Sequence, residues 1–239
     1  YNGEQEVGAC LESLTSQEYA GSLDVVVVDD GSTDGTVQVV KQFRGVRCVR
    51  QRHAGPAAAR NQGVRQARGE VVLFTDADCV PAKDWVAQMA APFEQSDVAG
   101  VQGVYKSRQP ELMARFSQIE IEERYQRMKQ RDRIDFVGTY AAAYRRSVFL
   151  EHGGFDESFP IASGEDPELS FRVAQKGGKL VLNPQAVVYH SHPHSLRAYV
   201  RLKFWRAYWR VLLYKKHANK MISESYTPQG LKLQIGLFG

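Results

Sequence analysis

The stretch Val25-Val26-Val27-Val28-Asp29-Asp30 decides the fold class, because four β-branched residues form a buried strand and two acids follow it directly. A second stretch repeats the design: residues 71–75 are largely apolar and lead into Asp76-Ala77-Asp78. Carboxylates gathered at the ends of buried strands are costly to keep charged unless a cation or hydrogen-bond donors compensate them. The pattern therefore indicates a divalent metal at this edge of the sheet.

Helical and extended patterns alternate around these two stretches. Strand patterns at 25–28, 46–49, 71–75 and 98–105 are separated by helical patterns at 4–18, 33–43, 56–67 and from residue 81 onward. Such alternation predicts an α/β fold with a mostly parallel central sheet covered by helices on both faces. Ligands of open α/β sheets bind beyond the carboxyl ends of the strands, so Asp30, Asp76 and Asp78 are expected at one rim.

The order and length of the expected helices and strands change in the second part of the chain. Residues 111–131 form a long charged helical pattern, 138–144 a strand, and 165–176 a short helix that Gly177-Gly178 ends. Two short strands are expected at 179–182 and 186–189. We expect one main domain up to residue 196.

Composition and charge exclude several classes of protein. The chain has 239 residues and three scattered cysteines without CxxC spacing, so a disulfide framework or structural zinc site is not expected, and a reducing cytoplasm fits. Eight of the 31 basic residues lie in 197–220, which holds no acid, and the remaining 23 face 27 acidic residues. This division predicts an anionic surface touched by one segment and argues against nucleic-acid binding.

The turn after the first strand carries acids where a dinucleotide-binding turn carries glycines. It runs from Asp29 to Gly35 and lacks the Gly-x-Gly-x-x-Gly pattern that meets a pyrophosphate through backbone amides. Its carboxylates would repel a bare pyrophosphate but can accept hydrogen bonds from a base or ribose. Asp76 and Asp78 lie on the same side of an extended chain, so one can hold a metal and the other a ribose hydroxyl.

Six motifs together resemble the inverting glycosyltransferases of family 2, and they occur in family order from Tyr1 to about residue 190. The motifs are Tyr1-Asn2-Gly3-Glu4, Asp29-Asp30-Gly31-Ser32-Thr33-Asp34, Ala59-Arg60-Asn61-Gln62-Gly63, Asp76-Ala77-Asp78, Gly153-Gly154-Phe155-Asp156 and Gly164-Glu165-Asp166. The resemblance implies a GT-A fold with a Rossmann-like nucleotide-sugar-binding half at 1–105 and an acceptor half at 106–196. It also implies a nucleoside-diphosphate sugar donor and a magnesium or manganese ion.

The resemblance also implies roles for individual residues. Asp30 would receive the nucleobase in a pocket lined by Tyr1 and Glu4, and Arg60 would lie near the base or the phosphates. Asp76, with Ala77 beside it, would meet the ribose, and Asp78 would bind the metal that bridges the diphosphate. Asp166 would be the general base with Glu165 next to it, and His190 would complete the metal shell.

Each of these residues also has a purely structural interpretation. Asp166 lies where a helix begins and can act as a cap, Asp76 and Asp78 can form a solvated turn, and Arg60 can pair with an acid on a helix surface. His190 can be an ordinary strand residue, and His192 and His194 are interpreted as loop residues. The order of the motifs favours the functional interpretation for Asp166.

The basic segment 197–239 predicts an amphipathic helix at a membrane surface. Drawn as a helix, its apolar stripe comprises Leu202, Trp205, Trp209, Leu212 and Leu213, with cations on both flanks. Aromatic residues and uncompensated cations suit an anionic bilayer interface, whereas the alternative is a helix that docks on the catalytic domain. A membrane location would suit a lipid-linked or saccharide acceptor in cell-surface polysaccharide synthesis.

The sequence departs from the family pattern at two points. The strand that normally precedes the Tyr-Asn motif is absent, which predicts a fragment, and residues 231–239 could begin a membrane-spanning segment. The Gln-x-x-Arg-Trp signature of processive synthases is also absent, which favours the addition of one sugar per encounter. UDP is the expected nucleotide of the donor. Two other classes remain: a non-catalytic nucleotide-sugar-binding module and a nucleotidyltransferase.

Overall fold

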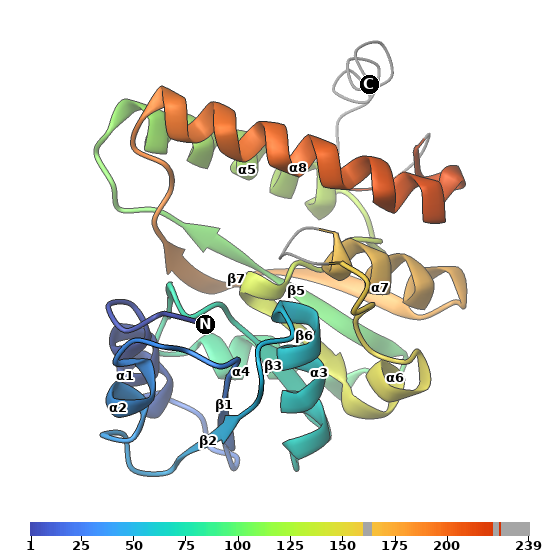
Figure 1. Ribbon diagram of the computed structural model, residues 1–239. Coiled ribbons are helices and arrows are strands. Elements are labelled where there is room, and N and C mark those ends of the chain that lie inside the picture. The colour runs from blue at the N-terminus through green and yellow to red at the C-terminus, as the bar shows by residue number, and fades with distance from the viewer. Residues whose placement is uncertain (160–163, 222–224, 226–239) are drawn as a thin grey trace.

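The computed structural model describes residues 1–159, 164–221 and 225, and Figure 1 shows two sheets with helices packed around them. The membrane-spanning segment predicted to begin within 231–239 lies outside these residues. Within the described ranges, no helix has both the length and the apolarity that crossing a bilayer requires.

The N-terminal part is built on a small parallel sheet. Strands β1 (Val25–Asp29) and β2 (Val46–Arg50) pair in parallel, with α2 (Thr36–Val40) connecting them and α3 (Pro56–Gln66) following. Helix α1 (Val7–Thr15) packs beside α2, and Val7, Leu11 and Val40 form a small buried cluster there. This arrangement places the turn after β1 against the first residues of the chain.

The larger sheet has five strands in the order β3-β6-β5-β7-β4. Their bounds are β3 (Val71–Phe74), β4 (Cys79–Pro81), β5 (Val98–Lys106), β6 (Ala142–Arg145) and β7 (Lys179–His190). Only β5 and β7 pair in parallel, and the other three pairings are antiparallel. The α/β class is as predicted, but the mostly parallel arrangement is corrected to a mixed one, because apolar periodicity does not encode strand direction.

The remaining elements cover this sheet. They are α4 (Trp85–Ala90), η1 (Ala91–Glu94), α5 (Leu112–Lys129), η2 (Thr139–Ala141), α6 (Arg146–Glu151), α7 (Glu165–Gln175), α8 (Leu196–Lys216) and η3 (Ala218–Met221). The two short strands predicted at 179–182 and 186–189 are one strand, β7, whose pairing with β5 shifts register between Gln102 and Val104.

The main core lies around the five-stranded sheet, and the buried polar side chain of Gln102 forms its hydrogen bonds within this core. Trp85, Met89 and Tyr144 are fully buried in this core. Gln102 is also fully buried on β5, and its side chain donates to the Ala141 carbonyl at 3.2 Å and accepts from the Gly138 amide. Because buried amides need partners, this contact ties β5 to the segment that leads into β6.

Helix α8 lies alongside α5 at one side of the molecule (Figure 1). Lys203 and Tyr199 of α8 reach Glu120 of α5 at 2.6 Å and 3.0 Å. The face that docks includes Leu213, which is 1% exposed, with Leu202 and Trp209 half-buried. The prediction that the apolar stripe of this helix faces a membrane is therefore wrong, because most of the described residues of the stripe face the protein.

The prediction that all eight cations lack compensation is also wrong. Lys203, Lys216 and Lys220 pair with Glu120, Asp156 and Asp135. These acids lie on or beside α5 and in the loop before α7. The three pairs hold α8 and the following η3 against α5, the residues just after α5, and the residues that follow α6.

Candidate active site

The first residues of the chain are hydrogen-bonded to the turn after β1. The Asn2 amide donates to Ser32 Oγ and the Gly3 amide to Thr36 Oγ1, both at 2.9 Å. The Glu4 carboxylate accepts from the Gly35 amide at 2.9 Å. These contacts place the first residues of the chain beside the acidic turn, and the Glu4 carboxylate is engaged in holding that turn.

Asp30 is the buried anchor of this region. Its Oδ1 accepts from Gln51 Nε2 at 2.8 Å and from the Ala54 amide at 2.9 Å, and its Oδ2 accepts from the Gly55 amide at 2.9 Å. His53 Nδ1 lies 2.9 Å from Oδ2. Burial alone would raise the pKa of Asp30, but these donors lower it below its ordinary value. A nucleobase that binds Asp30 would have to replace one of the two side-chain donors.

Tyr1 completes the rim of this pocket. Its ring lies 4.6 Å from the ring of His53 between centroids, and its residue is 62% exposed. Gly3 approaches Ala77, since a β-carbon on Gly3 would lie 3.8 Å from that of Ala77. The first motif, the acidic turn and the Asp76-Ala77-Asp78 motif are therefore neighbours in the fold.

Arg60 connects two acidic motifs that lie far apart in the sequence. From α3 its Nη2 donates to Asp76 Oδ1 at 2.9 Å and its Nη1 to Glu165 Oε1 at 2.7 Å. The side chain of Arg60 is 17% exposed and that of Glu165 is 2% exposed. Despite burial, the two carboxylates raise the pKa of Arg60. Glu165 Oε2 is buried without a hydrogen-bond partner among the described residues.

Asp166 follows at the start of α7. Gly164, at a φ of +113°, turns the chain into this helix, a conformation that side chains rarely adopt. Asp166 therefore lies in the first turn, next to Glu165. Burial raises the pKa of Asp166 to about 7, the charge of Glu165 adds to the rise, and Arg60 opposes it. A carboxyl group whose pKa is raised in this way is a candidate for proton transfer.

Asp78, Cys79 and His190 bring three potential metal ligands within 4.8 Å of one another. His190 Nδ1 lies 3.6 Å from Asp78 Oδ2 and 3.9 Å from Cys79 Sγ. The antiparallel pairing of β4 with β7 sets Cys79 directly opposite His190. Carboxylate and imidazole are ligands that divalent Mn²⁺ accepts, so the predicted pair fits such an ion. Cys79 was missed, since the sequence does not show cross-strand neighbours.

The other histidines do not join this cluster in the described part of the chain. His192 is buried, and its Nε2 lies 2.9 Å from Gln118 Oε1 of α5. Burial lowers the pKa of His192 to about 4. His194 is exposed. Both residues lie in the loop after β7, as predicted, and the buried His192 fastens this loop to α5.

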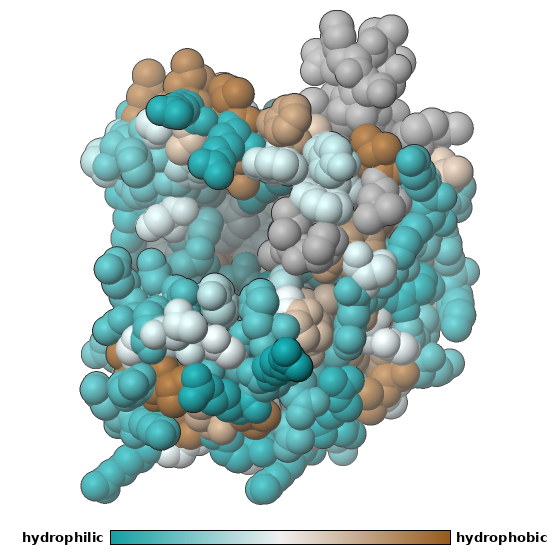
Figure 2. Space-filling model, viewed as in Figure 1, coloured by the Kyte–Doolittle hydropathy of each residue, from teal (hydrophilic) through white to brown (hydrophobic). Residues whose placement is uncertain are grey.

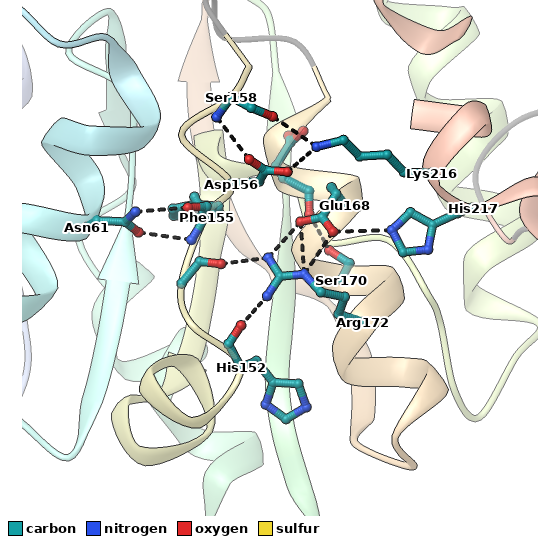
Figure 3. Close-up of polar contacts among 12 residues, drawn as sticks. Asn61, His152, Phe155, Asp156, Ser158, Glu168, Ser170, Arg172, Lys216 and His217 are labelled. Atoms are coloured by element: carbon teal, nitrogen blue, oxygen red, sulfur yellow. Dashed lines mark hydrogen bonds and ion pairs between the residues drawn. The ribbon is translucent and has the colours of Figure 1, made fainter. Parts of the chain in front are cut away.

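The loop between α6 and α7 is held by a network that Figure 3 shows. Asn61, next to Arg60 on α3, donates to the Phe155 carbonyl and accepts from the Phe155 amide, both at 2.9 Å. Arg172 of α7 binds Glu168 and the Gly154 carbonyl, and Glu168 Oε1 lies 3.2 Å from His217 Nε2. The Gly-Gly-Phe-Asp motif thus has a structural role: it positions the loop that leads to α7.

Comparisons with known proteins agree with this geometry. The model of glycosyl transferase family 2 matches residues 1–153. A pre-mycofactocin glycosyltransferase of Mycobacterium tuberculosis is 31% identical over 76% of this chain and 40% of its own length. An N-acetylglucosaminyltransferase of Azorhizobium caulinodans is 29% identical over 93% of this chain and 62% of its own length.

Solved structures show the same fold. The mannosyltransferase PcManGT from Pyrobaculum calidifontis, in complex with GDP-Man and Mn²⁺, superposes with a TM-score of 0.74 at 25% identity, over 99% of this chain and 66% of that one. Staphylococcus aureus TarS 1–349 superposes with a TM-score of 0.65 at 21% identity, over 98% of this chain and 66% of that one.

The fold is the GT-A type of nucleotide-sugar-dependent transferases. The chain belongs to glycosyl transferase family 2, which confirms the resemblance drawn from its six motifs. It spans 40% and 62% of the length of the two curated relatives described above.

Proposed function

We propose that this protein transfers a sugar from a nucleoside diphosphate to a hydroxyl group of an acceptor, with inversion at the anomeric carbon. The observation that carries the proposal is the Arg60 bridge, which joins Asp76 at 2.9 Å to Glu165 at 2.7 Å. It brings the start of α7, where Asp166 lies, to the strand-end motif that would hold the donor. A base and a donor site at one opening are what a displacement at the anomeric carbon requires.

Asp166 is the proposed general base. Its carboxylate takes the proton of the acceptor hydroxyl as the new C–O bond forms on the face opposite the departing diphosphate. A pKa of about 7 suits this task, because the group is partly deprotonated at neutral pH yet basic enough to accept a proton. Glu165 beside it contributes to that pKa and is held in place by Arg60.

The donor would lie across the rim formed by the first motifs. Asp30 would accept a hydrogen bond from the base, with Tyr1 and Glu4 around it, and Asp76 and Ala77 would meet the ribose. We propose UDP as the nucleotide of the donor, with uracil as the base, and GDP is the second candidate because PcManGT is described in complex with GDP-Man. Gln51 and His53, which already bind Asp30, would then distinguish one base from the other.

Asp78 and His190 would hold a divalent cation, Mn²⁺ or Mg²⁺. Their side chains converge, and Asp78 is half exposed, which leaves room for a diphosphate. When bound, the ion supplies Lewis acidity that stabilises the charge of the departing diphosphate. PcManGT is described with Mn²⁺, which supports this assignment.

The acceptor is proposed to be a saccharide or a lipid-linked glycan that receives one sugar per encounter at the cytoplasmic face of a membrane. This would place the reaction in cell-surface polysaccharide or lipid-linked glycan synthesis, without nucleic acid as a partner. The catalytic unit is assigned to residues 1–196, with donor contacts from 1–105 and acceptor contacts from 106–196.

Incubation of the protein with radiolabelled UDP-, GDP- and dTDP-sugars, Mn²⁺ and a panel of saccharide and lipid-phosphate acceptors tests the proposal. We expect one nucleoside diphosphate to be released with formation of a glycosylated product, whose anomeric configuration NMR shows to be inverted. Tight binding of a donor without turnover on any acceptor would favour a non-catalytic binding module. Release of pyrophosphate from a nucleoside triphosphate would favour a nucleotidyltransferase.

A further inference from the structure

Helix α8 presents a second stripe of residues, on the side opposite its docking face. All of its members are exposed and follow one another at intervals of four and three residues, which places them on one helical face. These residues are Arg197, Arg201, Phe204, Tyr208, Val211 and Lys215. The stripe has an aromatic and apolar centre with cations toward both ends and no acid.

Neighbouring residues widen this stripe into a surface. Leu196, Val200 and Trp205 of α8 are 63%, 55% and 45% exposed. On α5, Leu112, Phe116 and Ile119 are 81%, 50% and 63% exposed, and the Phe116 ring meets that of Tyr199 at 5.6 Å. Figure 2 shows brown side chains gathered along the side of the molecule where α5 and α8 lie. We refer to these residues and the stripe as the α5–α8 face.

Six of the eight cations in 197–220 fall into two groups: three bind acids of the protein body and three do not. Lys203, Lys216 and Lys220 bind acids of the protein body. Arg197, Arg201 and Lys215 form no ion pair with any residue that the structure describes. Their charges therefore remain for an external partner, and they border the exposed aromatic rings.

The region around the start of α5 adds cations. An open hollow of about 460 Å³ is lined by Arg108 and Arg115 together with Gln118 and Ile119. Ile119 belongs to the α5–α8 face, so the hollow adjoins it. The guanidinium carbon of Arg108 lies 3.9 Å from the centroid of the Tyr189 ring, and Tyr189 is the β7 residue directly before His190.

We propose that the α5–α8 face binds the surface of an anionic lipid bilayer. Exposed aromatic rings enter the headgroup boundary while cations pair with lipid phosphates, and each cation near such a surface contributes about 1 kcal/mol. A basic segment with no acid would select anionic over neutral lipid. A water-soluble acidic partner would account for the cations but not for nine large apolar side chains in the same exposed face.

The same helix borders the candidate active site. A small cavity of about 20 Å³ is lined by His190 and His192 on one side and by Leu202, Lys203 and Arg206 of α8 on the other. A bilayer bound to the α5–α8 face would therefore lie close to the opening that holds Asp78 and His190. The inference rests on the surface alone, so its test is independent of the proposed reaction.

Flotation of the 239-residue chain with vesicles of phosphatidylcholine, with or without phosphatidylglycerol, tests the inference in the absence of any donor. We expect recovery with the anionic vesicles only. Arg197→Glu with Arg201→Glu should lower the partition coefficient by about thirtyfold or more. The matched control is Lys41→Glu with Arg44→Glu, an equal charge change at exposed positions after α2, and it should lower binding far less.

The apolar part of the face is tested separately. Phe204→Ser should weaken binding about tenfold, whereas Leu150→Ser, an exposed residue of α6, should leave it unchanged. Equal recovery with neutral and anionic vesicles, or an equal loss in the control pair, would overturn the inference. So would a dimer on size exclusion that Phe204→Ser disperses, since the face would then bind a second copy. Circular dichroism checks that each variant is folded.

Discussion

Arg60 and Glu165 form a buried ion pair that joins the two halves of the site: Nη1 lies 2.7 Å from Oε1, and the side chains are 17% and 2% exposed. The second guanidinium nitrogen binds Asp76 at 2.9 Å. Arg60 thus balances carboxylates from two motifs that lie on either side of the opening. Both halves of the site depend on this one cation.

Removal of the Arg60 charge should therefore destabilise the fold as well as the site. In Arg60→Met, Glu165 remains buried without a counter-charge, which should lower the free energy of unfolding by about 3–5 kcal/mol. Urea denaturation measures this loss. Arg65→Met is the control, because Arg65 is an exposed residue of the same helix and its side chain donates to the neutral Gln62 at 2.9 Å. The double variant Arg60→Met with Glu165→Gln should recover part of the stability, and no recovery would contradict this explanation.

The Asp166→Asn variant separates binding from chemistry. Asparagine keeps the shape of the side chain but cannot accept the proton, so turnover should fall about 10²- to 10⁴-fold. Donor affinity, measured by calorimetry with Mn²⁺, should stay within about twofold of the unchanged protein. Full turnover in the variant would show that another group is the base.

The raised pKa of Asp166 predicts the pH dependence of the rate. The base acts when deprotonated, so kcat should rise with pH and level off above about 7. Stability should change in the opposite direction. In the unfolded chain the carboxyl group of Asp166 ionises near its ordinary pKa of 3.8, whereas in the folded protein it stays protonated up to about pH 7. The contribution of this group to the free energy of unfolding therefore decreases as the pH rises between these two values.

Denaturation of Asp166→Asn at two pH values tests that sign. Asparagine does not ionise, so the variant should gain stability relative to the unchanged protein between pH 5 and pH 8. A constant difference across this interval would mean that Asp166 is not the group with the raised pKa. Glu165, whose pKa burial also raises, would then be the candidate.

Sequence reasoning located the carboxylates well because strand ends are a local feature. The run of valines that ends at Asp29 and Asp30 identifies a strand and its last residues without knowledge of the remaining fold. It did not show that Asp30 accepts hydrogen bonds from Gln51 and from the Ala54 and Gly55 amides, since those partners come from the loop between β2 and α3. Partners across elements depend on topology rather than on local pattern.

The face of helix α8 that turns toward the protein could not be predicted from the sequence for the same reason. It carries apolar residues on more than one face, so its sequence alone does not select the face that turns inward. That selection comes from acids elsewhere: Glu120 on α5, Asp156 after α6 and Glu168 on α7. The strand directions of the larger sheet were missed for a related reason, because the long helix α5 between β5 and β6 permits either direction.

The Asp78→Asn variant tests the metal site. Loss of the carboxylate should abolish the increase in donor affinity that Mn²⁺ gives over chelator, because Asp78 and His190 form the ligand pair. His190→Ala should reduce the same increase by about 10- to 100-fold. Asp84→Asn, an exposed acid before α4, is the control and should change nothing. Identical donor binding in Mn²⁺ and in chelator for the unchanged protein would contradict the assignment.

The ion pair between Lys216 and Asp156 holds the end of α8 against the residues that follow α6. Burial raises the pKa of Asp156, but Lys216 and Ser158 lower it to about 2 (Figure 3). The pair therefore stabilises the fold above the ordinary carboxyl value of 3.8, and that contribution is lost as pH falls toward 2. Because the Lys216 side chain is 35% exposed, Lys216→Met should cost only about 1 kcal/mol at pH 6. Denaturation should show this cost shrinking below pH 4, whereas a cost that is independent of pH would assign it to lost packing against Phe159.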